Sequence, residues 1–211
     1  FTINVTKARG MPGVALILTA AEVADLGDLP CLFNLETDPF TGPPYPILAR
    51  DEVRHVGDAI AFVVADTIDQ ARDAIEAIEV NWTPLPSVVG LVNAVKPGAP
   101  LVWPDKPGNV LFDVPIGDKA ATDAAFAKAH AVAEVSIVNP RVITNFMETR
   151  AAVAEYDAKR DHLTLTIGSQ GSHRLREILC GMVLKMPMEK MRVICPDVGG
   201  GFGTKLFPYR E

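Results

Sequence analysis

Side chains that commonly bind metals are scarce in this sequence. Its 211 residues contain three cysteines and four histidines, and no C-x-x-C pair occurs among them. The odd number of cysteines argues against a disulfide framework, and the missing paired spacing argues against a zinc site. We therefore expect reduced thiols, surface histidines and no side-chain metal ligand at these positions: Cys31, Cys180, Cys195, His55, His130, His162 and His173.

Long hydrophobic runs and an excess of basic charge are also missing. The run AIAFVVA at residues 59–65 is far shorter than the roughly 20 residues that a membrane-spanning helix needs. The net charge is −6 with both signs interspersed, which disfavours a nucleic-acid partner because the phosphate backbone favours a basic face. No secretory signal pattern is visible. We expect a protein without a membrane span that is cytoplasmic, with a periplasmic location as the alternative.

Apolar residues are abundant, at 48% of the chain, and can form a substantial core. Near the N-terminus, residues 12–19 (PGVALILT) predict a short strand after a Pro-Gly turn. The next segment, residues 19–27, has Thr19 followed three residues later by Glu22, which is the spacing of a capping box. The pattern predicts a helix that ends at Gly27.

A strand–helix–strand pattern follows. Residues 51–66 (DEVRHVGDAIAFVVAD) predict two strand-like segments joined by a turn, and residues 78–86 predict a further strand that two prolines end. Between them, residues 67–79 predict a helix whose capping box pairs Thr67 with Gln70. The apolar residues at helical spacing are Ile68, Ala71, Ile75 and Ile78, and we expect them to pack inward. This arrangement indicates a sheet with helices on one face.

Proline and glycine separate this region from a second one. Residues 28–48 read as a loop, and residues 88–117 read as a connector, near which we place a domain boundary. Beyond the connector, the predicted elements are strands at 129–138, 151–157, 162–168 and 191–197, with a hairpin turn at 158–161 and a helix at 172–184. We expect Ser172 to be the N-cap of that helix and Leu175, Ile178, Leu179, Met182 and Val183 to be its buried residues. The whole pattern predicts an α+β fold.

The stretch PDVGGGFGTK at residues 196–205 suits neither a helix nor a strand. Glycine allows positive φ and close approach to the backbone, so consecutive glycines can present several N–H groups on one concave surface. Such a surface binds anions such as phosphate or oxo groups. Lys205 would add positive charge, and Phe202 would stand at the tip of the loop.

Competing interpretations of this loop fit less well. A dinucleotide-binding fingerprint requires glycine where Thr204 stands, and Pro208 compromises the helix that should follow it. A Walker A loop lacks its Gly-Lys-Ser/Thr ending. From the local pattern alone, a glycine-rich bend without a ligand stays open.

A second polar loop precedes the helix at residues 172–184. Gln170 stands where a predicted strand ends and that helix begins, and its carboxamide offers both a donor and an acceptor. The two loops could converge on one ligand, although a surface position for Gln170 also stays open. Glu148 and Arg150 stand at the entrance to a strand, and we expect a structural role there, as an ion pair or through hydrogen bonds, with a pocket role as the alternative.

The residues from Gln170 to Lys205 carry a resemblance to a known family. QGSHRLREILCGMVLKMPMEKMRVICPDVGGGFGTK is similar to the molybdenum-cofactor segment in the large subunits of the xanthine dehydrogenase family, which includes aerobic carbon-monoxide dehydrogenase and aldehyde oxidoreductases. Residues 48–86 resemble the α/β hammerhead domain of those subunits, and FMETR at 146–150 resembles the segment that opens their cofactor-binding region. The resemblance implies a hammerhead domain at residues 1–90, a connector at 91–117, and the truncated N-terminal part of a molybdenum-cofactor-binding domain at 118–211.

The resemblance also implies roles for single residues. Gln170 would contact an oxo ligand of molybdenum, and Phe202 would lie beside the substrate pocket, so both are expected at the catalytic centre. The cofactor would be lined by these two residues and by Gly199, Gly200, Gly201 and Gly203.

The function implied is that of a catalytic large subunit that oxidises a small aldehyde, an N-heterocycle or carbon monoxide with oxygen derived from water. The implied cofactor is Mo-molybdopterin in its cytosine dinucleotide form. An iron–sulfur small subunit and an FAD-binding medium subunit would be the partners, in a dimer of heterotrimers.

Two departures qualify these expectations. Leu206 follows Lys205, where animal-type xanthine and aldehyde members have a glutamate, which puts a purine-dedicated pocket in doubt. Family large subunits are several times longer than this chain, and their catalytic glutamate lies further along, so we expect a fragment that is inactive alone. A non-catalytic assembly or interaction module that keeps the hammerhead scaffold, and a nucleotide-binding α/β protein, remain the alternatives.

Overall fold

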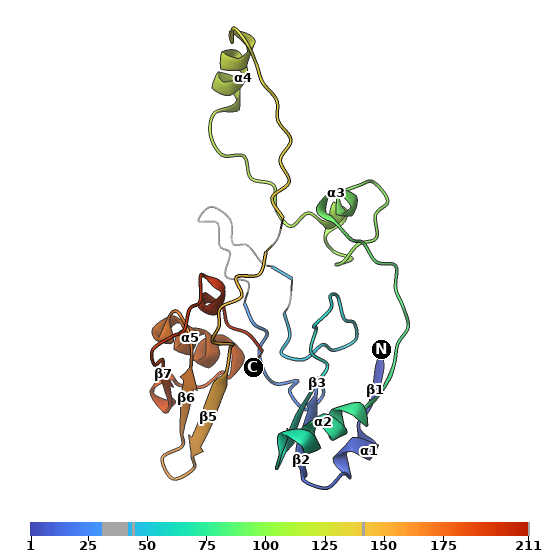
Figure 1. The fold of residues 1–211 in the computed structure, drawn as a ribbon, viewed down its shortest axis with the longest axis vertical. Helices are drawn as coiled ribbons and strands as arrows, with labels where there is room; N and C mark the ends of the chain where they lie inside the picture. The colour runs from blue at the N-terminus through green and yellow to red at the C-terminus, as the bar shows by residue number, and fades with distance from the viewer. Residues whose placement is uncertain (31–41, 44, 141, 211) are drawn as a thin grey trace. The chain divides into compact units, whose positions relative to one another are not determined.

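The chain forms two compact units. The structure, a computed structural model, describes residues 1–30, 42–43, 45–140 and 142–210. One unit consists of residues 1–86 together with 145–211, and the other consists of residues 87–144. Small sheets and a few helices build the first unit, which bears out the expected α+β class (Figure 1).

The N-terminal part of the first unit is built on a two-stranded sheet. Strand β2 (Val14–Thr19) pairs antiparallel with β3 (Ala61–Ala65). Helices α1 (Thr6–Arg9) and α2 (Ile68–Glu76) pack against this sheet, and the buried residues of their shared core are Ala8, Ile17 and Ala74. The expected arrangement of helices on a sheet is thus confirmed for this part (Figure 1).

Helix α2 begins as the sequence predicts, but its buried face differs in part from the expected one. Thr67 Oγ1 accepts a hydrogen bond from the Gln70 N–H, and Gln70 Oε1 accepts one from the Thr67 N–H, which completes the capping box. The expected inward face was wrong at Ile68 and Ile75, which are 67% and 56% exposed, whereas Ile78 packs against the core as expected. The fully buried residue of the helix is Ala74. Close packing on the sheet requires a small side chain at the contact, and alanine provides it.

Three further expectations for this part were wrong. The strand expected at 78–86 shortens to β4 (Glu79–Asn81), which pairs antiparallel with β1 (Thr2–Asn4) and not with the β2–β3 sheet. The residues just after position 50 form bends instead of a first strand. Residues 20–25 form successive turns instead of a helix. Glu22 does accept hydrogen bonds from the Thr19 N–H and Oγ1, as a capping box requires, but the Gly27 N–H donates to the Val183 carbonyl, so the end of the segment is held by a distant part of the chain. The loop expected at 28–48 lies in part outside the described residues, as does Cys31.

A three-stranded sheet organises residues 145–211. Strand β5 (Ala152–Asp157) pairs antiparallel with β6 (His162–Ile167) across the expected hairpin turn, and β6 pairs parallel with β7 (Met191–Ile194). Helix α5 (Ser172–Ile178) connects β6 to β7 and packs its buried face on them. The shared core contains Leu165, Leu175, Cys180 and Met191.

Helix α5 departs from its prediction in two ways. Gly171 is the N-cap, so Ser172 is the first helical residue and makes no capping hydrogen bond. After Ile178 the helix widens into a π-helical turn, η2 (Leu179–Val183), which rotates Met182 outward to 49% exposure. The widened turn also presents the Val183 carbonyl to Gly27.

The second unit contains two helices that the sequence analysis did not predict and, among its described residues, lacks the strand that it did predict. Its helices are α3 (Leu91–Ala94) and α4 (Lys119–Ala127), with a short 3₁₀ turn at Pro107–Asn109. Asp118 caps α4 by accepting a hydrogen bond from the Ala121 N–H, a signal that the sequence contained and that our prediction missed. The strand expected at 129–138 is absent, since these residues pair with no strand among those the structure describes.

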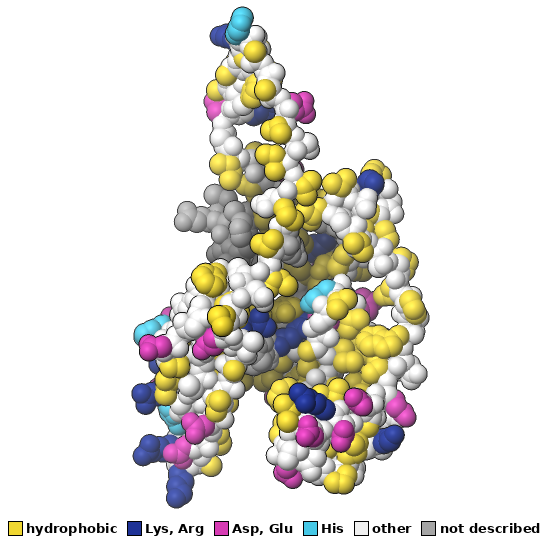
Figure 2. Space-filling view, in the orientation of Figure 1, with side chains coloured by type: hydrophobic (Ala, Val, Ile, Leu, Met, Phe, Trp, Pro, Cys, Tyr) yellow, Lys and Arg dark blue, Asp and Glu magenta, His cyan; other side chains and the backbone are white. Residues whose placement is uncertain are grey.

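Hydrophobic side chains are exposed over this second unit. They include Val132, Val135, Ile137 and Val138, which are 61% to 86% exposed. Figure 2 shows this as the hydrophobic colouring over α4 and the extended segment after it. A strand at this position would need a hydrogen-bonding neighbour that the described chain does not supply. In the described parts of the chain, no helix is both long and apolar enough to cross a bilayer.

Candidate functional site

Parallel pairing of β6 and β7 brings two polar loops together. Carboxyl ends of parallel strands meet at the same edge of a sheet, which is a common place for ligand sites. Gln170 follows β6, and the glycine loop, residues 199–203, follows β7. The Gln170 N–H donates to the Lys205 carbonyl at 3.0 Å, so the two loops are joined directly by a main-chain hydrogen bond.

The glycine loop has the left-handed conformations that its sequence favours. Gly200 and Gly203 have φ of 95° and 92°, and Phe202 between them has φ of 48°. The loop closes where Thr204 N–H donates to the Gly201 carbonyl at 2.9 Å. Phe202 projects from the tip with 72% of its surface exposed.

Gln170 reaches into this loop. Its Oε1 accepts a hydrogen bond from the Gly203 N–H at 3.0 Å. A Cβ added at Gly201 would lie 2.5 Å from the same oxygen, so the carboxamide fills the space that the missing side chain leaves. Because the carboxamide oxygen faces Gly203, the Nε2 group is the donor that remains for a ligand.

Glu148 supports the other end of the loop. Its Oε2 accepts a hydrogen bond from the Gly199 N–H at 2.8 Å, and a Cβ at Gly199 would lie 2.6 Å from the Glu148 Cβ. The same carboxylate pairs with Lys205, so Glu148 has the expected structural role, with Lys205 as its partner. Hydrogen bonds from Lys205 and from the Gly199 N–H lower the pKa of Glu148.

Lys205 lies elsewhere than the sequence suggested. We expected its charge on the concave side of the glycine loop, but the residue is 2% exposed and its ammonium group pairs with Glu148 behind the loop. The ammonium nitrogen also lies 4.5 Å from the centre of the Phe146 ring. A buried ammonium must be paired, and FMETR provides both partners. Lys205 is therefore a support of the loop.

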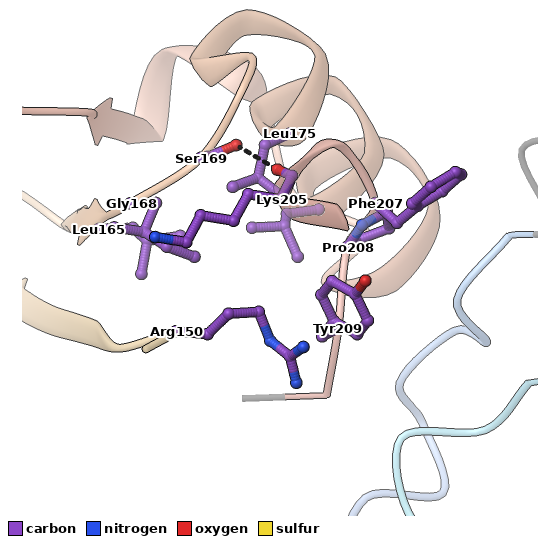
Figure 3. A pocket seen from close by; sticks show the side chains of 11 residues that line it. Arg150, Leu165, Gly168, Ser169, Leu175, Lys205, Phe207, Pro208 and Tyr209 are labelled. Atoms are coloured by element: carbon purple, nitrogen blue, oxygen red, sulfur yellow. Dashed lines mark hydrogen bonds between the residues drawn. The ribbon is translucent and has the colours of Figure 1, made fainter. Parts of the chain in front are cut away.

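A small cavity of about 40 Å³ lies behind these residues. Figure 3 shows the Lys205 side chain extending past Gly168, with the Ser169 hydroxyl donating to the Lys205 carbonyl, and the Tyr209 ring facing Arg150. The Arg150 guanidinium lies 3.7 Å from the centre of that ring. This space holds about one water molecule and cannot be a substrate pocket.

A larger cavity of about 490 Å³ is lined mainly by apolar residues of the first 62 positions, with Arg150, Tyr209 and Arg210 at its edge. None of its lining residues belongs to the glycine loop or to the Gln170 loop. This cavity is therefore not part of the site formed by the glycine loop and Gln170.

The cysteines that the structure describes are free thiols, and His55, His130 and His173 are exposed, as expected, while His162 is half-buried. Cys180 is buried in the core, where burial raises the pKa of its thiol. The Cys195 thiol donates to the Ser169 carbonyl at 2.9 Å and braces the Gln170 loop. Within the described ranges, no group of three or more potential metal ligands comes together.

The donors around the glycine loop suit an anionic cofactor. The N–H groups of Gly200, Gly201 and Phe202 donate to no partner within the described chain, although Gly201 itself is buried. Together with Gln170 Nε2 they form a set of donors at one sheet edge. A concave surface of backbone N–H groups binds phosphate or oxo groups and needs no metal ligand from the protein, so the residues present fit a molybdopterin.

The sequence matches two family descriptions in succession. Residues 1–86 match "Aldehyde oxidase and xanthine dehydrogenase, a/b hammerhead domain", and residues 102–211 match "Molybdopterin cofactor-binding domain". The second range contains all of the site residues from Glu148 to Lys205. Our own domain boundaries remain a prediction.

Individual proteins agree with this assignment. The carbon monoxide dehydrogenase large chain of Afipia carboxidovorans is 37% identical over 99% of this chain and 26% of its own length. The structure of reconstituted CO dehydrogenase from Oligotropha carboxidovorans superposes with a TM-score of 0.87 at 34% identity, over 99% of this chain and 27% of that one. For quinoline 2-oxidoreductase from Pseudomonas putida 86 the TM-score is 0.86 at 32% identity, over 97% of this chain and 25% of that one.

The chain thus spans about a quarter of the length of the curated relatives that it matches first. The match to the cofactor-binding description covers more than half of the chain, and the observed glycine loop and hammerhead part lie within the matched ranges. The chain therefore belongs to the molybdopterin cofactor-binding family of aldehyde oxidase and xanthine dehydrogenase type.

Proposed function

We propose that this chain supplies the hammerhead domain and the first cofactor loops of the large subunit of a molybdenum hydroxylase. The observation that carries the proposal is the convergence of Gln170 with the glycine loop. Gly203 N–H fixes the orientation of the carboxamide, and three backbone N–H groups at Gly200, Gly201 and Phe202 have no partner within the described chain.

Each of these residues would have a definite part in binding. The N–H groups of the glycine loop would hold the anionic groups of the molybdopterin, and Gln170 Nε2 would donate to an oxygen of the metal centre. Phe202, exposed at the loop tip, would form one wall for a small or planar substrate. When bound, the molybdenum centre would supply a two-electron oxidation that uses oxygen derived from water.

The finer assignments are part of the same proposal. We propose the cytosine dinucleotide form of the cofactor, an iron–sulfur small subunit and an FAD-binding medium subunit as partners, and a dimer of heterotrimers. Carbon monoxide, a small aldehyde or an N-heterocycle would be the substrate. The relatives support this range, since their names include both carbon monoxide dehydrogenase and quinoline 2-oxidoreductase.

Metal and pterin analysis of the complete natural subunit, purified after maturation with its partners, tests the proposal. We expect about one molybdenum and one pterin per subunit, with cytidine monophosphate released on hydrolysis. Turnover is then measured with the three substrate classes and an artificial electron acceptor. A mature subunit without molybdenum would refute the proposal, and a loaded subunit that oxidises none of these classes would favour a non-catalytic assembly module.

A further inference from the structure

One oxygen atom holds both ends of the glycine loop. Glu148 Oε2 accepts the Gly199 N–H at 2.8 Å, where the loop begins, and it also pairs with the Lys205 ammonium, just beyond the loop's end. The loop between these two residues is therefore closed across a carboxylate that comes from a distant segment of the chain. We propose that Glu148 and Lys205 are a positioning pair that sets the distance between the glycine loop and Gln170.

Lys205 connects the pair to Gln170. Its carbonyl accepts the Gln170 N–H at 3.0 Å and the Ser169 hydroxyl at 3.4 Å, while its ammonium reaches Glu148 on the other side. Moving the Lys205 side chain would therefore shift the start of the loop through Glu148 and would disturb Gln170 through the main chain. This is why the pair can act on ligand donors that it does not touch.

Burial makes the pair sensitive to the loss of either charge, but unequally. The Lys205 side chain is fully buried, whereas the Glu148 side chain is 42% exposed. Removing the carboxylate charge leaves an unpaired buried ammonium, which is strongly unfavourable. Removing the ammonium leaves a carboxylate that water can still solvate. We therefore expect Glu148→Gln to disturb the loop more than Lys205→Met does.

The segment that carries Glu148 directs alternate side chains toward the glycine loop and the residues after it. Phe146, Glu148 and Arg150 contact Gly200, Gly199 and Tyr209 respectively, so alternate side chains of FMETR support the glycine loop and the residues after it. Met147, between them, is 99% exposed. This alternation indicates that one side of the segment packs against the glycine loop and supports it.

The inference rests on the proposed function, and its test has a readout that does not need the cofactor. In the complete natural subunit, prepared without molybdenum, hydrogen exchange is measured on the peptide that covers residues 199–205. We expect faster exchange of this peptide in Glu148→Gln and in Lys205→Met, with unchanged exchange in the β5–β6 hairpin. Unfolding midpoints identify any variant that fails to fold.

In matured subunits, molybdenum per subunit should fall by roughly 10- to 100-fold in Glu148→Gln, by analogy with the loss of other supporting residues at metal sites. The Lys205→Met variant should lose less molybdenum than Glu148→Gln. The double variant Glu148→Gln/Lys205→Met should retain more molybdenum than Glu148→Gln alone, because it leaves no buried charge unpaired. The Mo(V) resonance spectrum of the fraction that is still loaded should differ from that of the wild type, since Gln170 is displaced.

Lys190→Met is the matched control. It breaks the ion pair of Lys190 with Asp161, whose side chains are 44% and 56% exposed, and it should change neither loop exchange nor molybdenum content. The inference is overturned if loop exchange and molybdenum content of the single variants match the wild type. If Glu148→Gln does not fold, loop exchange and molybdenum content are compared instead between the wild type, Lys205→Met and the double variant, and values equal to the wild type overturn the inference. A wild type without molybdenum refutes the proposed function, while the exchange of the loop still decides this inference.

Discussion

Gln170 Oε1 and the Gly203 N–H lie 3.0 Å apart and join loops that follow two parallel strands. This bond decides which end of the carboxamide faces a ligand, because an N–H group can only donate to the oxygen. Nε2 is then directed elsewhere and can donate. The chemistry that we propose for the site depends on that orientation.

The first prediction concerns this carboxamide. Gln170→Ala removes the Nε2 donor from an exposed side chain, so the unfolding midpoint should change little. The turnover number of the matured complex should fall by roughly 100- to 1,000-fold, as for the loss of one donor to a developing negative charge. Steady-state kinetics with the natural substrate measure this, and near-normal turnover would contradict the role given to Gln170.

The second prediction concerns Gly201. In Gly201→Ala the new Cβ would lie 2.5 Å from Gln170 Oε1 and 2.9 Å from its Cδ, so the carboxamide must leave the loop. We expect a loss of turnover that approaches that of Gln170→Ala, with folding retained because the displaced side chain can move into solvent. Gly171→Ala is the control, since its Cβ would meet only the Arg174 Cβ at 3.9 Å. Equal activity of the two alanine variants would contradict the steric argument.

The convergence of the two loops could be predicted because its signals are local. Glycines after an apolar strand and a glutamine at the end of another strand are visible in the sequence, with a single predicted helix between them. The capping box at Thr67 and Gln70 was likewise visible, because its partners are three residues apart. Both features depend on short spacings, which the sequence shows directly.

The role of Lys205 could not be predicted in the same way. Its partner Glu148 lies 57 residues away, and only the folded structure shows which side of the loop the ammonium occupies. The helix expected at 19–27 failed for a related reason, because Gly27 bonds to Val183 and that contact lies far along the chain. Long-range contacts of this kind override local propensity.

The third prediction concerns this contact. A Cβ at Gly27 would lie 1.7 Å from the Met182 carbonyl oxygen and 2.8 Å from its carbon, which are backbone atoms that cannot rotate away. Gly27→Ala should lower the free energy of unfolding by about 3 kcal/mol or more, as severe overpacking does. Urea unfolding followed by circular dichroism measures this. Gly10→Ala, whose Cβ would meet the Lys7 carbonyl at an ordinary 3.6 Å, should change stability far less, and similar losses in both would contradict the packing explanation.

The fourth prediction concerns the acid dependence of folding. Hydrogen bonds from the Thr19 hydroxyl, the Thr19 N–H and Arg9 lower the pKa of Glu22 from 4.5 to about 2. A lowered pKa in the folded state means that Glu22 stabilises the fold fully above pH 4.5, and that this contribution is lost as the pH falls toward 2. Between these pH values, the free energy of unfolding should fall less in Glu22→Gln than in the wild type.

Unfolding measured at a series of pH values for both proteins tests this directly. Arg9→Met should give an intermediate pH dependence, because it removes one of the donors and leaves both bonds from Thr19 in place. The explanation fails if the stability difference between wild type and Glu22→Gln is the same at pH 6 and at pH 2.5, since a carboxylate with a lowered pKa must lose its advantage as it takes up a proton.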